Sequence, residues 1–425
     1  MKRDIPALVV LPEKSSQVSE IMKICHANAI PVWPRGAGSG TAGASVPGSS
    51  GIVMSMSRFN RIISISPDNL QAVVEPGVVT GVLQQQVERH GLFYPPDPAS
   101  LSFCTIGGNV STGAGGARAV KYGVTRDHVI SLEVCLADGT IINTGSATAK
   151  GVAGYDLTRL FIGSEGTLGI VTRVTLRLVP MPEACGTITG FFPDMASAAK
   201  SVGCLFRNRL LPRCAEFLDE KSLVCASEKL PLPLPEDAKA MLLVEVDGPE
   251  TSIATQLETV TGCFQLNGVL STFRARTPEE AASIWAARRA VSPAMKKLGF
   301  RHKINEDICV PRSALPEMIN RLETIEKRHG LCIVTFGHAG DGNLHVNVMH
   351  NGEDRNGFAP ANAAVNEIMR SAVELGGTIS GEHGIGLAKR PFMEIEFPET
   401  ALEIMRGIKR AFDPLDILNP GKVLP

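Results

Sequence analysis

The sequence predicts an α+β protein whose first half and middle are built on different plans. Glycine-rich loops recur between short strands in residues 1–182, whereas strands and helices alternate through residues 183–375. A histidine- and glycine-rich hairpin lies in the last third of the chain. The 425 residues suffice for about two to four domains with well-developed cores.

The chain opens with a strand, a helix and a second strand. Residues 7–11 are an apolar run that ends at a proline, residues 15–29 show helical apolar spacing, and residues 30–33 form the next strand. The segment Arg35–Thr41 then follows as a glycine-rich loop that can offer several backbone N–H groups to a pyrophosphate. It lacks the Gly-Lys-Ser/Thr end of a P-loop and does not fit a Rossmann fingerprint, so alone it equally suits a flexible loop.

Further glycine-rich segments strengthen the ligand interpretation. They are Thr105–Gly108, Gly113–Gly116, Tyr122–Arg126 and Gly163–Gly169, the last leading into a strand over residues 170–178. Repeated glycines within one domain indicate backbone packed closely against a long ligand. A dinucleotide meets that demand better than a single phosphate does.

The middle of the chain predicts a ferredoxin-like antiparallel layer, because its strands and helices alternate. Expected strands cover residues 186–192, 241–247, 269–275 and 303–310. Expected helices cover residues 195–207, 252–263, 278–298 and 313–329.

A candidate metal site lies in the histidine-rich hairpin and a later loop. His338 ends a predicted strand over residues 331–336, and His345 begins another over residues 344–349, with hairpin chemistry between them. Glu382 completes the two-His, one-carboxylate set typical of a catalytic divalent metal, suiting Zn, Fe or Mn. His383 is a candidate base. The alternative is a plain hairpin turn with hydrogen-bonded core histidines.

Composition excludes several partners. The net charge of -1 gives no reason to expect nucleic acid or an anionic membrane. The ten cysteines contain no C-x-x-C spacing, so we expect apolar fillers in a reducing, cytoplasmic compartment. No apolar run is long enough to span a bilayer, and membrane association would be peripheral, through a partner.

The motifs together resemble a known flavoprotein superfamily. Arg35–Ser39, Glu75–Gly77, Pro95–Ser100, Thr105–Gly108, Gly154–Leu157 and Gly163–Gly169 resemble the FAD domain of the vanillyl-alcohol oxidase/p-cresol methylhydroxylase superfamily. The segments His338–His345, Gly381–Gly384 and Asn419–Lys422 resemble its 2-hydroxy-acid branch. That branch includes glycolate oxidase catalytic subunits, D-lactate dehydrogenases and D-2-hydroxyglutarate dehydrogenases.

The resemblance implies a PCMH-type FAD-binding domain over residues 1–182, a substrate or cap domain over 183–375, and a segment over 376–425 that returns to the FAD domain. Ser39 and Gly113 depart from the usual Thr and Asn, and members usually begin with an extra helical segment, so we expect an N-terminal piece to be missing. No attachment histidine stands near the flavin loops, which implies non-covalent FAD. The cofactor-binding residues carried over are Arg35, Gly36, Ala37, Gly38, Ser39, Gly40, Pro95, Asp97, Thr105, Gly107, Gly108, Gly115, Gly116, Tyr122, Gly123, Glu165, Gly166, Gly169, Ile170 and Asn419.

In the cap, Trp285-Ala-Ala-Arg288 resembles the family's W-x-x-R element. The resemblance makes Arg288 the group that clamps the substrate carboxylate through a bidentate fork. The alternative is a solvated charge on a helix.

The resemblance implies FAD- and metal-dependent oxidation of a small D-2-hydroxy acid, with D-lactate or glycolate favoured. His383 would take the hydroxyl proton and flavin N5 the hydride. Relatives pass electrons to an electron-transferring flavoprotein, an iron–sulfur subunit or a quinone, and the sequence is compatible with a homo-oligomer. Two alternatives stay open: an alkyl-dihydroxyacetone-phosphate synthase-like flavoenzyme, and a non-catalytic flavin subunit of an oxidase complex.

Overall fold

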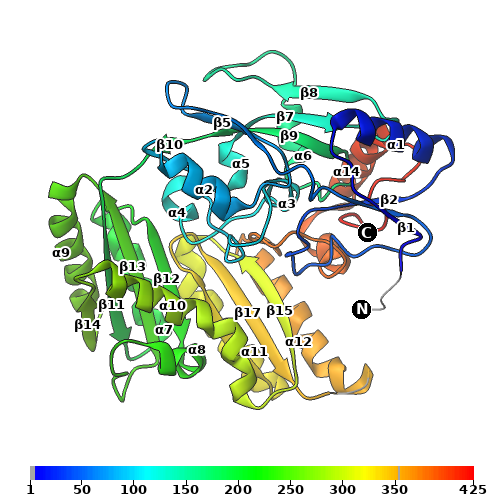
Figure 1. Cartoon of the computed structure of the whole chain (residues 1–425). Coiled ribbons are helices and arrows are strands. Elements are labelled where there is room, and N and C mark those ends of the chain that lie inside the picture. The colour runs from blue at the N-terminus through cyan, green and yellow to red at the C-terminus, as the bar shows by residue number, and fades with distance from the viewer. Residues whose placement is uncertain (1–4, 353–354) are drawn as a thin grey trace. The chain divides into compact units, whose positions relative to one another are not determined.

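The computed structural model describes residues 5–352 and 355–425. The chain forms two compact units (Figure 1). The first unit comprises Met1–Gly116, Gly123–Met181 and Glu382–Pro425, and the second comprises Ala117–Tyr122 and Pro182–Gly381. No helix within the described ranges is both long and apolar enough to cross a membrane. All ten cysteines are free thiols, and seven of them are buried, as expected for apolar fillers.

Three sheets form within the described residues of the first unit. Its five-stranded antiparallel sheet has the order β4-β5-β9-β7-β8, formed by Ile62–Ser66, Gln71–Val74, Ile170–Arg177, Val129–Cys135 and Ile141–Gly145. A parallel sheet of order β1-β3-β2 joins Leu8–Val10, Ile52–Ser55 and Val32–Arg35. A two-stranded ladder pairs β10 (Val179–Pro180) with β6 (Leu92–Phe93). The helices are α1 (Ser15–Ala27), α2 (Thr80–Glu88), α3 (Ile106–Thr112), α5 (Thr125–His128), α6 (Leu157–Phe161), α13 (Met393–Glu396) and α14 (Glu399–Phe412).

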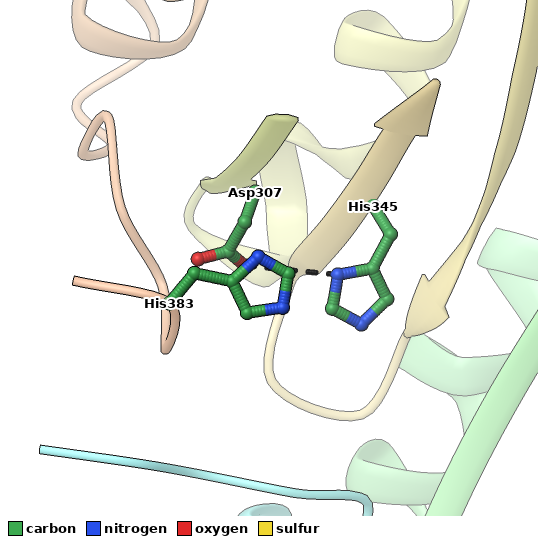
Figure 2. Close-up of side chains that lie close together, drawn as sticks. All are labelled: Asp307, His345 and His383. Carbon is green, nitrogen blue, oxygen red and sulfur yellow. Dashed lines mark ion pairs between the residues drawn. The ribbon is translucent and has the colours of Figure 1, made fainter. Parts of the chain in front are cut away.

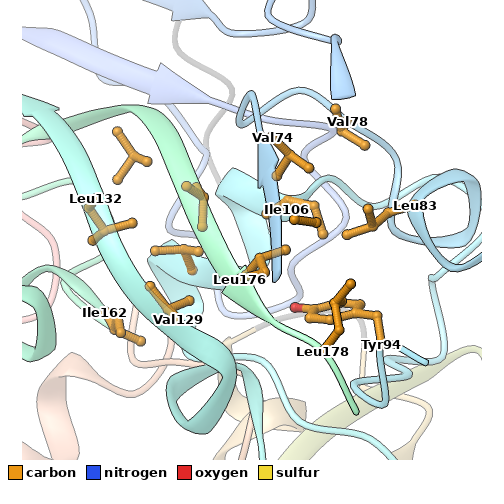
Figure 3. Packing of buried hydrophobic residues seen from close by; sticks show 14 of the residues in the cluster. Val74, Val78, Leu83, Tyr94, Ile106, Val129, Leu132, Ile162, Leu176 and Leu178 are labelled. Carbon is orange, nitrogen blue, oxygen red and sulfur yellow. The ribbon is translucent and has the colours of Figure 1, made fainter. Parts of the chain in front are cut away.

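The largest core of this unit lies between the five-stranded sheet and helices α2 and α3 (Figure 3). Val74 and Leu176 from the sheet, Leu83 from α2 and Ile106 from α3 are all fully buried in it. Burial of such side chains contributes about 1.5–3 kcal/mol each, which fixes α3 and the loops at its ends. The loop after α3 carries Gly115 and Gly116, two of the glycines predicted to meet a ligand.

The second unit is built on one antiparallel sheet of seven strands, in the order β14-β11-β13-β12-β16-β17-β15. The strands are Ser271–Arg274, Ala184–Phe192, Ala240–Gly248, Cys214–Asp219, Cys332–His338, Asn343–His350 and His302–Cys309. Its longer helices are α7 (Met195–Arg207), α8 (Glu220–Ala226), α9 (Glu250–Leu266), α10 (Pro278–Ala294), α11 (Leu315–His329) and α12 (Arg355–Glu374). Helix α4 (Ala119–Tyr122) also belongs to this unit.

Helices cover both faces of this sheet. On one face, Phe191, Leu218 and Phe336 share a core with Ile284 and other residues of α8 and α10. On the other face, α9 packs closely because β11 carries glycines. A Cβ at Gly186 would lie 2.7 Å from Leu257, and one at Gly190 would lie 2.7 Å from Phe264. Alternating strand residues therefore serve two different helical layers.

Most predicted elements are present. The expected helix over 195–207 matches α7, and the expected hairpin strands match β16 and β17 within two residues at each end. The sequence prediction missed β12 and α8, because Cys214–Asp219 is a short run interrupted by a charge. This omission matters, since β12 carries a residue of the site described next.

Candidate active site

The predicted hairpin brings two histidines together. In the β16–β17 ladder Phe336 faces His345 and His338 faces Asn343, so the two imidazoles are diagonal neighbours on one side of the sheet. Their Nε2 atoms lie 3.3 Å apart, and both side chains are buried. Two imidazole nitrogens that each bind one ion at about 2.0–2.1 Å in a tetrahedral arrangement lie about 3.3 Å apart. The pair therefore fits a shared divalent metal.

A buried carboxylate supports this pair from behind. Glu216 is the register partner of His338, and its Oε1 lies 2.5 Å from His338 Nδ1. Its Oε2 accepts hydrogen bonds from Arg288, with Nε at 2.9 Å and Nη2 at 2.7 Å. Burial alone would raise the pKa of the Glu216 carboxyl, but its contacts with His338 and Arg288 outweigh burial and lower that pKa.

Arg288, the expected substrate clamp, thus shares Glu216 with His338, and two of its nitrogens face that carboxylate. Its guanidinium also stacks 4.6 Å from the centre of the Phe336 ring. One turn earlier on α10, Trp285 Nε1 donates to Glu245 on β13 at 3.0 Å. The W-x-x-R spacing therefore anchors the helix with the first residue and directs the second to the site.

A second carboxylate stands on the other side of His345. Asp307 Oδ1 lies 3.8 Å from His345 Nδ1, as drawn in Figure 2, and accepts a hydrogen bond from Asn343 Nδ2 at 2.6 Å. The backbone N–H of Gly381 donates to Asp307 O at 3.4 Å. Gly381 ends the second unit, so the chain leaves this unit directly beside the His and Asp cluster.

Glu382 and His383 begin the last segment of the first unit. A Cβ at Gly115 would lie 2.8 Å from Glu382 Oε2, so the glycine makes room for that carboxylate. Downstream, Glu165 accepts hydrogen bonds from the N–H groups of Ile385 at 2.5 Å and Gly386 at 2.8 Å. The Glu165 carboxylate therefore fixes the loop that carries Glu382 and His383.

The loop after β2 is suited to bind a phosphate group. Among the described residues, none accepts a hydrogen bond from the backbone N–H groups of residues 37–40. Gly38 has φ of 70°, a conformation that favours glycine, and a Cβ at Gly40 would meet nothing within 4 Å. A row of available N–H donors beside open space fits the pyrophosphate of a dinucleotide.

Helix α3 and the C-terminal tail meet this loop. A Cβ at Gly36 would lie 2.5 Å from Thr105 Oγ1, which caps α3 by accepting the Gly108 N–H at 3.3 Å. From the tail, Asn419 Nδ2 donates to the backbone oxygens of Glu165 at 2.6 Å and Ala44 at 3.1 Å. Asn419 Oδ1 is buried and has no partner among the described residues, so it is an acceptor that a bound ligand can use.

The other expected cofactor residues are distributed more widely. The Arg35 guanidinium donates to Ser45 O at 3.2 Å, and Pro95 and Asp97 lie in the loop after β6, where a Cβ at Gly116 would meet Asp97 at 2.5 Å. Packing accounts for the glycines at four positions, where a Cβ would collide with a neighbour: Gly107 with Pro76, Gly123 with Asp127, Gly166 with Pro34 and Gly169 with Val134. Ile170 is buried at the start of β9.

Tyr122 ends helix α4, which belongs to the second unit. Its hydroxyl donates to Asp247 Oδ2 at 2.7 Å, and the neighbouring Lys121 ammonium pairs with the same carboxylate. These contacts tie α4 to β13.

Comparison with known proteins identifies the family of this chain. A family model described as the C-terminal domain of FAD-linked oxidases matches residues 181–423, and an FAD-binding domain model matches residues 6–145. The chain belongs to the FAD-linked oxidase family. It is therefore an FAD-dependent oxidoreductase, as the resemblance implied.

Named relatives of this FAD-linked oxidase align over nearly its full length. It is 42% identical to the glycolate oxidase subunit GlcD of Bacillus subtilis over 421 residues, which is 99% of this chain and 89% of the relative. It is 37% identical to a D-lactate dehydrogenase of Archaeoglobus fulgidus, covering 98% of this chain and 91% of the relative.

Two solved structures share the fold of this chain. A p-cresol methylhydroxylase structure superposes with a TM-score of 0.79 at 18% identity, covering 99% of this chain and 89% of that one. An alkyldihydroxyacetonephosphate synthase superposes with a TM-score of 0.76 at 19% identity, covering 98% and 76%. At these identities the likeness concerns the fold alone.

Two residues of the oxidase's candidate site were not predicted. Asp307 lies within a predicted strand, and Glu216 lies in the strand that the prediction missed. A signal did exist, because a single carboxylate within the apolar run Cys214-Ala-Glu-Phe-Leu218 needs a buried cation or donor.

Proposed function

We propose that this FAD-linked oxidase oxidises a small 2-hydroxy acid, with D-lactate or glycolate favoured, to the 2-oxo acid and uses a divalent metal. The names of its relatives support the substrate class. The observation that carries the metal is the imidazole pair of His338 and His345, whose Nε2 atoms lie 3.3 Å apart in a buried setting.

The metal would be held by His338, His345 and Glu382. Glu382 follows directly on Gly381, whose N–H is bonded to the Asp307 carbonyl, and this adjacency in the chain supports Glu382 as the third ligand. Two imidazoles and one carboxylate suit Zn, Fe or Mn. When bound, the ion supplies a Lewis acid for the substrate hydroxyl.

Three further tasks fall to side chains. Arg288 would bind the substrate carboxylate with Nη1, which makes no hydrogen bond to another described residue, while Glu216 holds its other nitrogens. His383, next to the third ligand, would take the hydroxyl proton. The α-hydrogen leaves with its electron pair, and non-covalent FAD supplies the two-electron acceptor.

Reduced flavin must pass its electrons on. The GlcD relative is named as a subunit of an oxidase, which supports a protein acceptor for this chain. We propose an electron-transferring flavoprotein or an iron–sulfur subunit, with a quinone as the alternative.

The test is a panel of D- and L-2-hydroxy acids with a dye acceptor, run on FAD-loaded protein with and without added Zn, Mn or Fe. We expect turnover of a D-acid or glycolate that a chelator abolishes and metal restores. Turnover that resists chelation would contradict the metal. No turnover of any acid by protein that holds both FAD and metal would favour the synthase-like or non-catalytic alternatives.

A further inference from the structure

Glu216 is a single carboxylate whose two oxygens serve two different functional groups. Oε1 lies 2.5 Å from His338 Nδ1, and Oε2 receives both contacts from Arg288. The carboxylate is only 1% exposed, so water cannot replace either partner. The protein has placed one buried charge where the two halves of the proposed substrate site meet within the second unit.

The contact with His338 has a chemical consequence at the far nitrogen of the ring. A carboxylate beside Nδ1 favours the tautomer that carries its proton on Nδ1. The lone pair then resides on Nε2, which faces His345 Nε2 at 3.3 Å. Only this tautomer can bind a metal through Nε2.

The contact with Arg288 fixes the orientation of its guanidinium group. Glu216 engages Nε and Nη2, the Phe336 ring supports the face of the guanidinium, and Trp285 holds the helix one turn earlier. A planar fork held on one edge has little rotational freedom left, so Nη1 points in a set direction.

We propose that Glu216 is the positioning residue of the active site, and that it sets the tautomer of a metal ligand and the orientation of the substrate clamp with one carboxylate. This inference rests on the proposed function. It predicts that metal affinity and substrate binding are coupled through a residue that touches neither.

The experiment compares Glu216→Gln with Glu245→Gln in the full chain. Glu245 is the matched control, because it is a largely buried glutamate on the adjacent strand, paired with Arg213 at 3.0 Å and bonded to Trp285, away from His338. Metal affinity is measured with Zn²⁺ against a competing chelator, and KM and kcat are measured with the acid that the wild type turns over.

For Glu216→Gln we expect metal affinity to fall about 10- to 100-fold and KM to rise, with FAD content unchanged. Glu245→Gln should keep the metal affinity of the wild type. Should Glu216→Gln fail to fold, Glu216→Asp is the substitute variant. It keeps the charge but is one methylene shorter, so it should weaken the contact with His338, with Arg288 or with both. Its metal affinity should then fall by less than the roughly 10- to 100-fold expected for Glu216→Gln.

The tautomer of His338 can be measured without metal, so the inference can be tested independently of metal binding. In metal-free protein labelled with ¹⁵N-histidine, the His338 ring should show the Nδ1–H tautomer, assigned by its absence in His338→Ala, and Glu216→Gln should shift that equilibrium. A wild-type level of metal affinity and KM in Glu216→Gln overturns the inference while the proposed function stands. A wild type that binds no divalent metal overturns the proposed function first, and an Nε2–H tautomer overturns the inference whatever the metal result.

Discussion

The two units prepare for their ligands in different ways. In the first, the loop after β2 offers backbone N–H groups, and glycines such as Gly36 and Gly40 leave space near them. In the second, the sheet offers side chains: His338 and His345, supported by Glu216 and Asp307. The first unit is suited to bind through backbone groups that glycines leave accessible, and the second through side chains.

This difference teaches how each region should respond to substitution. A backbone site is insensitive to most side-chain deletions and sensitive to added carbon atoms. A side-chain site loses its function when one imidazole or carboxylate is removed, although the sheet around it persists. The predictions below test this contrast, from the largest expected effect to the smallest.

Removing a metal ligand should have the largest effect. His338→Ala, His345→Ala and Glu382→Ala should each lose metal and lower turnover about a thousandfold or more, because a Lewis acid contributes several kcal/mol. FAD should stay bound, since these side chains lie outside the glycine loops. Elemental analysis, flavin absorbance and turnover check this. His302→Ala, on neighbouring β15, is the control and should retain metal; unchanged metal in all three ligand variants would refute the assignment.

Removing the proposed base should come next. His383→Ala should reduce flavin about 10²- to 10⁴-fold more slowly, the usual contribution of general base catalysis, while metal and FAD remain. Rapid mixing of enzyme with substrate, followed at the flavin absorbance band, measures this rate directly. Wild-type reduction by this variant would assign His383 a structural role.

Adding carbon atoms to the glycine loop should act on the flavin alone. Gly40→Val should weaken FAD binding about ten- to a hundredfold, because a side chain would occupy space intended for the ligand. The unfolding midpoint of FAD-free protein should be unchanged, since a Cβ there meets nothing within 4 Å. Gly262 on α9 also has open space, and Gly262→Ala is the control that should keep FAD affinity. Tight FAD binding by Gly40→Val would contradict the assignment of this loop as the site of the FAD pyrophosphate.

The charged interior of the second unit should also make stability depend on pH. Burial raises the pKa of Asp219 to about 6, although Ser222 and Thr335 donate hydrogen bonds to it. The folded state then holds this proton more tightly than the unfolded state does. The associated stability is therefore complete below about pH 4 and lost as pH rises through about 6.

The measurement is the unfolding free energy of wild type minus that of Asp219→Asn at several pH values. This difference should fall by about 1 kcal/mol between pH 5 and 7, out of about 3 kcal/mol over the whole titration. A difference that is flat across this range would show that Asp219 is ionised throughout.

Local signals made much of the structure predictable. The glycine-rich loop after β2 and the hairpin that brings His338 and His345 together both follow from turn chemistry and strand periodicity over a few residues. The W-x-x-R element indicated Arg288 only by resemblance, and the structure shows its guanidinium sharing Glu216 with His338.

The parts that escaped prediction depend on contacts between distant residues. Glu216 meets Arg288 across 72 positions and His338 across 122, and no local pattern encodes either pairing. Likewise, the hydroxyl of Tyr122 bonds to Asp247, 125 positions away, and no local pattern encodes this contact. Periodicity predicts which face of an element is buried, but not which distant residues that face contacts.

Glu165 makes its side-chain contacts at a cost in backbone conformational energy. Its φ of 53° lies in the left-handed region, where a non-glycine residue costs about 1–2 kcal/mol, and glycine would remove that cost. The chain keeps glutamate there, and the carboxylate anchors two N–H groups of the loop that follows His383. The first unit therefore accepts a less stable backbone conformation at Glu165, because the carboxylate there restrains the loop that carries Glu382 and His383. A glycine at this position would relieve the backbone strain but would leave that loop without its restraint.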